Sequence, residues 1–300
     1  MKQKAIVVHH VSDVDGTCSA LVSKRFLESQ GMEVVLFGFN YGDKIPDLSG
    51  YDRIYLVDIS FPSPDMMGLP ETTTWIDHHI TAINDSLQYG YSNLPGLREL
   101  GKGACELCWR YFYGDSVPRF VQLCSTYDVF DKERMDWDND VLPLQSGIRG
   151  YYDGILPDRI YPDFEPLIKP ESPLLDKLLE MGRLLVRYDA RRFKSACKAY
   201  SFEIEVAGKF KGIACITTDF GSRLFDSVKQ NYSIYVCSNR KTLEDGTTKY
   251  TCSMYSDPKF TGMNLGEYMK ENYSGGGHPT AAGGVLSEEQ FLRLILEKKI

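Results

Sequence analysis

No part of this 300-residue chain has the run of ~18 apolar residues that a membrane-spanning helix requires. The opening Met1-Lys2-Gln3-Lys4 leads into an apolar stretch that is too short for the hydrophobic region of a secretion signal, and no cleavage site follows it. We therefore expect a cytoplasmic protein without a membrane partner. Hydrophobic residues form 43% of the chain and charged residues 25%, as in ordinary globular proteins, and the length suits about two domains.

The chain also lacks the cysteine pattern of a disulfide framework or of a structural zinc site. Most of its eight cysteines lie in apolar segments, where a small buried thiol packs well. Cys105 and Cys108 form a Cys-x-x-Cys pair, but no second pair follows it. On a helix, residues three apart share one face, so the simpler interpretation of this pair is packing in the core. We expect neither disulfides nor zinc.

An extended basic surface is missing as well, since 41 acidic residues outnumber 34 basic ones and the formal net charge is -7. A protein that coats long nucleic acid needs such a surface, so no long nucleic acid is expected, while short nucleotides held locally are not excluded. One basic stripe lies on the helix expected over residues 171–199. A solvated helix face is its simpler interpretation, and steering of phosphates is the alternative. The stripe comprises Arg183, Arg187, Arg191, Lys194 and Lys198.

Histidine is scarce, and all five histidines occur in three short motifs. His9 and His10 end the first apolar stretch, His78 and His79 follow a later one, and His278 stands in a glycine-rich segment. A single histidine is more often a structural residue than a ligand. Here that interpretation must account for five clustered placements at once, so the clustering points to metal chemistry.

Four apolar segments predict the strands of a parallel sheet, over residues 4–9, 32–39, 53–59 and 72–76. Acidic residues or histidines follow three of them. Because the carboxyl ends of parallel strands lie at one edge of a sheet, these side chains are expected to converge there. The residues concerned are Asp13, Asp15, Asp58, Asp77, His78 and His79.

Two of these aspartates allow a simpler interpretation. Helix capping would explain either Asp13 or Asp15, because a helix is expected to begin near residue 17, but it explains both of them together with an upstream histidine less well. Asp58 is different. An aspartate at the end of an apolar strand is costly to bury unless it is paired or bound to a cation, so Asp58 is a predicted metal ligand.

In their order and spacing, these residues resemble the DHH phosphoesterases, the superfamily of RecJ-type exonucleases, nano-RNA phosphodiesterases and family II pyrophosphatases. Three motifs of that superfamily match His9-x3-Asp13-x-Asp15-Gly16, Asp58 and Asp77-His78-His79. The fourth motif is an aspartate on a later helix. Asp128 is the candidate, because a helix beginning near Pro118 would carry it back to the same edge, and Asp131 is the competing residue.

This resemblance implies two-metal hydrolysis of a phosphate ester or anhydride. One ion would be held by His9, Asp13 and Asp58, and the other by Asp15, Asp58, His78 and Asp128. Such ligands favour Mn²⁺ for both ions, with Mg²⁺ or Co²⁺ as alternatives. His9 is preferred because its spacing fits the superfamily, and His10 stays open as its replacement. The segment from Gly103 to Trp109 resembles the helix after the DHH motif, for which packing is the expected role.

The segment Ser274 to Gly284 carries the glycines around His278. Glycines permit positive φ and close backbone approach, so the segment could form an anion-binding nest or approach a ligand closely. It resembles the GGGHxxAAG motif of the DHH-associated substrate-binding domain. The implied substrate-binding residues are Gly275, Gly276, Gly277, His278, Ser253 and Tyr255, and the implied catalytic residues are His79, Asp77 and His278.

One position departs from the pattern. Many nano-RNA phosphodiesterases of this superfamily carry Ser-x-Arg-Ser on the strand before the glycines, whereas this chain has Ser253-Met254-Tyr255-Ser256. Tyr255 offers a ring face and one hydroxyl in place of a guanidinium. The end group of the substrate therefore stays open.

We predict an α/β protein with an N-terminal parallel-sheet DHH domain over residues 1–170, a long linker helix over 171–199 and a smaller C-terminal mixed α/β domain over 200–300. The expected enzyme is a metal-dependent phosphodiesterase. It would release nucleoside monophosphates from short oligonucleotides, dinucleotides or substrates such as 3'-phosphoadenosine 5'-phosphate. A pyrophosphatase or exopolyphosphatase is the alternative, and a non-catalytic nucleotide sensor is the third hypothesis. The expected partner is thus a small nucleotide substrate, and a homodimer is left open.

Overall fold

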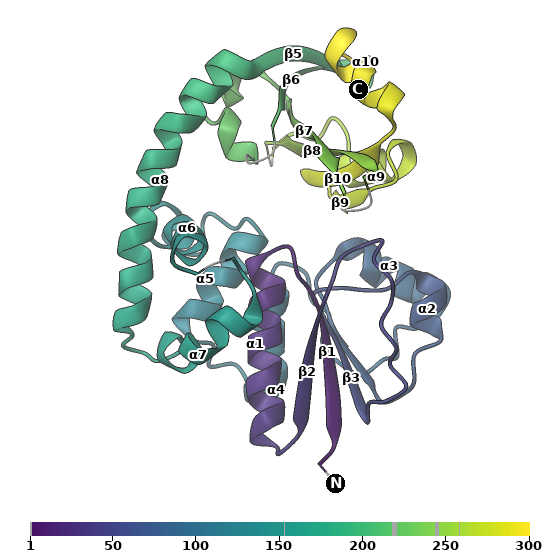
Figure 1. The fold of residues 1–300 in the computed structure, drawn as a ribbon, viewed down its shortest axis with the longest axis vertical. Coiled ribbons are helices and arrows are strands. Elements are labelled where there is room, and N and C mark those ends of the chain that lie inside the picture. Colours follow the sequence, from purple (N-terminus) through teal and green to yellow (C-terminus); the bar gives the residue numbers. More distant parts are fainter. Residues whose placement is uncertain (1, 153, 218–220, 244–245, 258) are drawn as a thin grey trace. The chain divides into compact units, whose positions relative to one another are not determined.

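The computed structural model describes residues 2–152, 154–217, 221–243, 246–257 and 259–300. The chain divides into two compact units, Met1–Val186 and Arg187–Ile300, each with its own sheet (Figure 1). The boundary falls inside one long helix, α8 (Pro173–Tyr200). Within the described ranges, every helix is too short or too polar to span a lipid bilayer.

The first unit contains a four-stranded parallel sheet, as predicted, and its hydrogen-bonded order is β2-β1-β3-β4. Its strands are β1 (Lys4–His10), β2 (Glu33–Phe39), β3 (Arg53–Val57) and β4 (Thr73–Ile76). Both faces of the central strands are buried, because successive residues point to opposite sides. Val7 belongs to one hydrophobic core, and its neighbours Ile6 and Val8 belong to the other.

Helices cover both faces of this sheet. Helices α2 and α3 lie on one side, and α1 and α4 lie on the other (Figure 1). The helices of this unit are α1 (Val14–Ser29), α2 (Ser63–Met67), α3 (Ile80–Tyr89), α4 (Ala104–Tyr113), α5 (Arg119–Asp128), a π-helical turn η1 (Trp137–Val141), α6 (Leu142–Tyr151), α7 (Pro157–Leu167) and the first part of α8.

Helix α6 packs directly against the first part of α8 through two glycines. A methyl group on Gly182 would lie 1.8 Å from the carbonyl oxygen of Pro143, and one on Gly147 would lie 2.1 Å from that of Leu178. Such distances leave no room for a side chain, so the two helices touch backbone to backbone. The position of α6 in the first unit depends on this contact.

The second unit is a six-stranded mixed sheet in the order β5-β6-β7-β8-β10-β9, in which only β6 and β7 pair in parallel. The strands are β5 (Ser201–Val206), β6 (Phe210–Ile216), β7 (Ile234–Thr242), β8 (Thr248–Ser256), β9 (Gly276–His278) and β10 (Ala281–Leu286). Helices α9 (Leu265–Asn272) and α10 (Glu288–Leu296) and the 3-10 turns η2 (Ser222–Phe225) and η3 (Lys229–Asn231) complete it.

All eight cysteines are buried free thiols. Cys105 and Cys108 lie in the core of the first unit, where the Cys105 thiol donates a weak hydrogen bond to the carbonyl oxygen of Val121. Their spacing of three therefore serves packing on one face of α4.

We predict that Gly182→Ala destabilises the first unit by about 1–3 kcal/mol, because the added methyl forces α8 away from α6. All three tryptophans, Trp75, Trp109 and Trp137, belong to this unit, so tryptophan fluorescence during urea unfolding follows it selectively. Glu180→Ala, on an exposed position of the same helix, is the control and should shift the midpoint little. Equal midpoints for the two variants would contradict the contact.

Candidate metal centre

The proposed ligands gather at the carboxyl edge of the parallel sheet. His10 ends β1, Asp58 follows β3, and Asp77 follows β4. Asp58 has a φ of 61°, in the left-handed region that non-glycine residues rarely adopt. Backbone strain of this kind persists only where the surroundings enforce it and is common at functional sites. At Asp58, directly after the end of β3, this backbone conformation accompanies a carboxylate that lies between His10 and His78.

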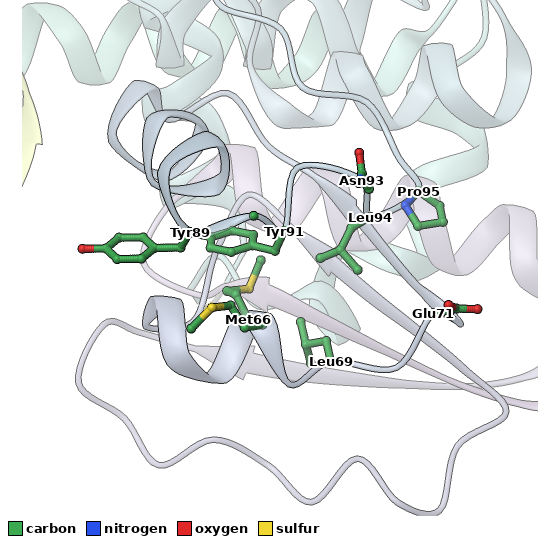
Figure 2. A pocket seen from close by; sticks show the side chains of 10 residues that line it. Met66, Leu69, Glu71, Tyr89, Tyr91, Asn93, Leu94 and Pro95 are labelled. Atoms are coloured by element: carbon green, nitrogen blue, oxygen red, sulfur yellow. The ribbon is translucent and has the colours of Figure 1, made fainter.

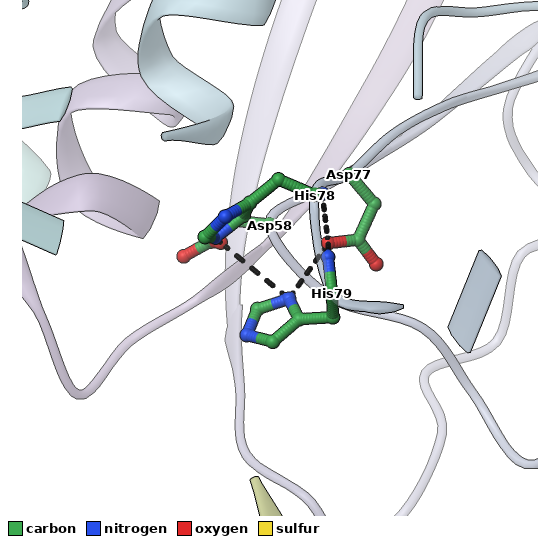
Figure 3. A group of neighbouring side chains, drawn as sticks. All are labelled: Asp58, Asp77, His78 and His79. Atoms are coloured by element: carbon green, nitrogen blue, oxygen red, sulfur yellow. Dashed lines mark hydrogen bonds and ion pairs between the residues drawn. The ribbon is translucent and has the colours of Figure 1, made fainter. Parts of the chain in front are cut away.

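Among the residues that the structure describes, three groups of side chains could each hold a metal ion, with ligand atoms within 4.8 Å of one another. Asp58 and His78 each belong to two of the groups, so the three form one continuous cluster. Figure 3 shows the members that surround His79. The groups are Asp58, Asp77, His78 and His79; His10, Asp13 and Asp58; and Asp15, His78 and Asp128.

The two carboxylate oxygens of Asp58 face different members of the cluster. Oδ2 lies 3.7 Å from Nδ1 of His10, while Oδ1 lies 3.3 Å from Nε2 of His78 and 3.9 Å from Nδ1 of His79. Asp58 is fully buried, and among the described residues neither oxygen accepts a hydrogen bond of acceptable geometry. A buried carboxylate in this state is costly unless a cation compensates it.

The structure places His10, and not His9, in this cluster. His9 belongs to none of the three groups formed by the described residues, and its Nδ1 lies 2.9 Å from the carbonyl oxygen of His10. Burial lowers the pKa of His9. Adjacent strand residues point to opposite faces, so an offset of one residue decides which imidazole meets Asp13 and Asp58. The spacing on which the choice of His9 rested did not resolve this offset.

Asp13 serves both as a helix cap and as part of the cluster. Its Oδ1 accepts a hydrogen bond of 2.8 Å from the amide of Gly16 and caps α1, while its Oδ2 lies 2.6 Å from Nδ1 of His10. Gly16 is needed there, because a methyl group on it would lie 2.1 Å from the carbonyl oxygen of His10. The helix cap expected for Asp13 is therefore observed, and the same side chain also lies within the cluster.

Asp15 is held by the amino terminus of helix α4. Its carboxylate oxygens accept hydrogen bonds from the amides of Ala104 (2.6 Å) and Cys105 (3.1 Å). Gly103 makes the approach feasible, since a methyl group there would lie 2.7 Å from Asp15 Oδ1. A helix amino terminus favours a negative charge, so α4 orients a candidate ligand in addition to packing in the core. From the sequence, only a packing role was expected for α4.

A buried chain of polar side chains fixes that helix end. Ser125 accepts a hydrogen bond from the amide of Gly103 (2.9 Å) and donates one to Glu106 (2.8 Å). Arg134 pairs with the same Glu106 carboxylate at 2.8 Å. Because Ser125 lies on α5, the chain ties α4 to the helix that ends at Asp128. No motif in the sequence signalled this network.

Asp128 is the aspartate that reaches the cluster. Its Oδ2 lies 3.1 Å from Nε2 of His78, while Asp15 Oδ2 lies 3.8 Å from the same nitrogen. The competing candidate, Asp131, lies beyond the end of α5 and accepts a hydrogen bond from the amide of Glu133. The last residue of α5 therefore supplies the carboxylate.

Asp77 organises the turn that carries the two histidines. Its Oδ1 accepts hydrogen bonds from the amides of His78 (2.7 Å) and His79 (3.2 Å) and lies 2.7 Å from Nδ1 of His79 (Figure 3). Its Oδ2 accepts a hydrogen bond from the indole of Trp75 at 3.3 Å. Asp77 is completely buried, whereas the His79 side chain is 21% exposed. Asp77 therefore fixes the orientation of a histidine that solvent or a ligand can reach.

The charges of the cluster act strongly on one another. Burial alone would lower the pKa of each imidazole, but the nearby carboxylates outweigh it and raise the pKa of His10 to about 10, of His78 to about 12 and of His79 to about 9. Burial raises the pKa of Asp15 well above its usual range, with Asp58 and Asp128 adding to the effect, and burial together with the charge of Asp13 raises that of Asp58. The cluster has an excess of negative charge that attracts cations.

These residues fit divalent cations. Carboxylate oxygens and imidazole nitrogens are the ligand set that Mn²⁺ and related ions accept. The buried Asp58 oxygens, which the described residues leave without hydrogen bonds, are the atoms that such ions would compensate. The donors would be His10, Asp13, Asp15, Asp58, His78 and Asp128.

The first unit has a large groove that is remote from these ligands and a small cavity among them. The groove, of about 600 Å³, is lined mostly by apolar side chains, among them Met66, Leu69, Tyr89 and Leu94 (Figure 2). The cavity, of about 30 Å³, is close to the volume of one water molecule and is lined by residues that include Asp13, Asp15 and Asp128. The smaller cavity marks the site.

In the second unit, the glycine segment forms an antiparallel hairpin of β9 and β10. Among Gly275, Gly276 and Gly277, only Gly277 has a positive φ, of 137°. A methyl group on Gly275 would lie 2.0 Å from the carbonyl oxygen of Gly283. Close strand packing, rather than a nest of amides, therefore accounts for this part of the segment.

The register of the second sheet brings four of the predicted substrate residues, Ser253, Tyr255, Gly276 and His278, onto one face. Tyr255 of β8 pairs with Ala281 of β10, which pairs with His278 of β9. In the neighbouring row, Ser253 pairs with Gly283, which pairs with Gly276. Paired residues of antiparallel strands point to the same side, and residues two apart share a face. A methyl group on Gly276 would meet no atom within 4 Å, so the space above this glycine is open.

No protein-family model matches the chain, and no curated protein matches it. Solved structures do. The DHH domain of a member of a family of ribosomal proteins is 13% identical, with 99% of this chain and 88% of that chain covered and a TM-score of 0.55. The chain has the fold of a DHH domain.

An exopolyphosphatase-related protein from Bacteroides fragilis is 14% identical over 99% and 91% of the two chains, with a TM-score of 0.44. RecJ from Thermus thermophilus in complex with Mn²⁺ is 16% identical over 97% of this chain and 51% of that chain, with a TM-score of 0.44.

The basic stripe on α8 is partly engaged within the first unit. Arg183 pairs with Asp140 at 3.2 Å, and its Nε donates a hydrogen bond to the carbonyl oxygen of Asn139. At least this end of the stripe therefore fixes α8 to the turn before α6.

Asp77→Asn should lower the pKa of His79 from about 9 towards the ordinary value of ~6.5, because the uncharged amide no longer stabilises the imidazolium. The carboxylate of Asp77 raises the pKa of His79, so removing its charge lowers that pKa. Nuclear magnetic resonance titration of the metal-free protein measures it directly. Asp131→Asn is the control and should leave His79 unchanged; an unaltered His79 pKa in Asp77→Asn would refute the pairing.

Proposed function

We propose that the protein is a metal-dependent phosphohydrolase in which Asp58 bridges two divalent cations. The observation that supports this most directly is the orientation of its carboxylate, with Oδ2 towards His10 and Oδ1 towards His78. One ion would be held by His10, Asp13 and Asp58. The other would be held by Asp15, Asp58, His78 and Asp128.

Bound cations would supply Lewis-acid chemistry and neutralise the charge of a phosphoryl group. The protein's own residues prepare the rest. Asp77 keeps His79 protonated and oriented through the contact at 2.7 Å. A charged, partly exposed imidazole beside the ligands is suited to stabilise negative charge on a phosphoryl oxygen or a leaving oxygen. Two imidazole ligands favour Mn²⁺, with Mg²⁺ or Co²⁺ as alternatives.

The substrate we propose is a short oligonucleotide, a dinucleotide or a small molecule such as 3'-phosphoadenosine 5'-phosphate. Support comes from the face of the second sheet on which His278 and Tyr255 flank Ala281 beside a row of glycines. An aromatic ring and an imidazole next to backbone without side chains suit a planar base and a phosphate. The net charge of -7 disfavours long nucleic acid.

Asp58→Asn should remain folded but lose bound Mn²⁺ and at least two orders of magnitude of turnover. Asparagine has the same shape and tolerates the positive φ, yet it carries no charge and offers only one ligand oxygen. Metal content by mass spectrometry, turnover and tryptophan fluorescence separate these effects. Asp131→Asn serves as the control. A folded Asp58→Asn protein with normal turnover would exclude the bridging role.

Among possible substrates, we expect hydrolysis to be fastest for oligonucleotides of two to five residues. Initial rates with Mn²⁺ on a dinucleotide, a 24-residue strand, pyrophosphate and tripolyphosphate test this at fixed salt. Preference for pyrophosphate or tripolyphosphate would favour the alternative phosphatase. Rates that stay flat or rise with strand length would rule out the short-substrate proposal. Metal binding without hydrolysis of any of them would favour the sensor.

A further inference from the structure

The small cavity beside the ligands contains a glutamine that neither the motifs nor the resemblance assigns. Gln145 lies on α6 and is only 2% exposed. Within the part of the chain that the structure describes, neither its amide oxygen nor its amide nitrogen has a hydrogen-bond partner. Leaving a buried polar group unsatisfied costs about 1–3 kcal/mol. Such a residue needs an explanation, and a missing ligand supplies one.

The surroundings of Gln145 indicate what that ligand is. The cavity of about 30 Å³ is also lined by Asp13, Asp15 and Asp128, which belong to two of the ligand groups. A space of this size holds one water molecule or one ion and is too small for a phosphate. Three carboxylates and one guanidinium, that of Arg149, line it, so negative groups predominate and an anion is disfavoured there. A single cation is the occupant that both the size and the charge allow.

We propose that the amide oxygen of Gln145 is a further contact of the cation held by Asp15, His78 and Asp128. Amide oxygens of asparagine and glutamine are accepted ligands of hard divalent cations. Helix α6 can hold the amide in place, because the helix packs closely against α8 at Gly147 and Gly182. Gly147 lies only two residues beyond Gln145. The proposal rests on the metal-dependent function proposed above and adds one residue to its ion site.

The proposal predicts opposite effects of one substitution on metal affinity and on stability. Gln145→Met keeps the volume but removes the polar atoms. Affinity for Mn²⁺ should fall roughly 10- to 100-fold, as for other residues that support metal ligands. The metal-free protein should be as stable as before or more stable, because an unsatisfied buried amide has been replaced by an apolar group. A purely structural glutamine would change stability and leave Mn²⁺ binding alone.

Isothermal titration with Mn²⁺ and urea unfolding in the presence of a chelator measure the two quantities on the full chain. Gln122→Met is the matched control, since Gln122 lies on α5 and donates a hydrogen bond to the carbonyl oxygen of Val117. It should weaken stability slightly and leave the Mn²⁺ affinity unchanged. Gln145→Glu tests the oxygen contact, because it retains a ligand oxygen and should bind Mn²⁺ at least as tightly as the wild type.

The outcomes are distinguishable. Wild-type protein that binds no Mn²⁺ would overturn the proposed function itself. If the wild type binds Mn²⁺ and Gln145→Met binds it within about twofold, only the role of Gln145 is wrong. If Gln145→Met and Gln145→Glu lose affinity equally, the amide oxygen is not the contact, and the proposal fails in that form.

Discussion

The burial of Asp58 is the constraint on which the rest of the first unit depends. A carboxylate that is 1% exposed, at a backbone angle unfavourable for its residue type, is unstable unless its surroundings compensate it. Three imidazoles approach its two oxygens to within 4 Å, and four further aspartates surround those imidazoles. Three of those aspartates, Asp13, Asp15 and Asp77, accept hydrogen bonds from backbone amides. The cluster therefore depends on how the strand ends and helix ends of the first unit are arranged.

Two helix amino termini perform most of that positioning. Helix α1 is capped by Asp13, and helix α4 donates two amides to Asp15. Both helices begin at the carboxyl edge of the sheet, where their positive ends offset the negative charge of the aspartates. Gly16 and Gly103 allow the close approach in each case. A side chain on either glycine would push against a candidate ligand, His10 in one case and Asp15 in the other.

Much of this arrangement could be predicted from the sequence. The parallel sheet follows from its apolar strands, and the convergence of Asp58 and His78 follows from the rule that parallel strands end at one edge. The reach of its helix favoured Asp128 over Asp131, and Asp128 lies beside His78. By contrast, the choice between His9 and His10 depends on a one-residue offset at the strand end, which a spacing pattern does not contain. The hold of α4 on Asp15 depends on a hydrogen bond between residues 89 apart in the chain. The cavity at Gln145 is likewise lined by residues distant in the chain, such as Asp15. Neither arrangement left a local signal.

The imidazole–carboxylate pairs have a consequence for how the centre would load. With pKa values of about 10 and about 12, His10 and His78 are protonated at neutral pH in the metal-free protein. An imidazole that becomes a ligand must first release its proton. Loading then releases protons, so acidity opposes it and the heat of binding varies with the ionisation enthalpy of the buffer. In the metal-free protein, the protons on His10 and His78 offset part of the negative charge of the neighbouring carboxylates.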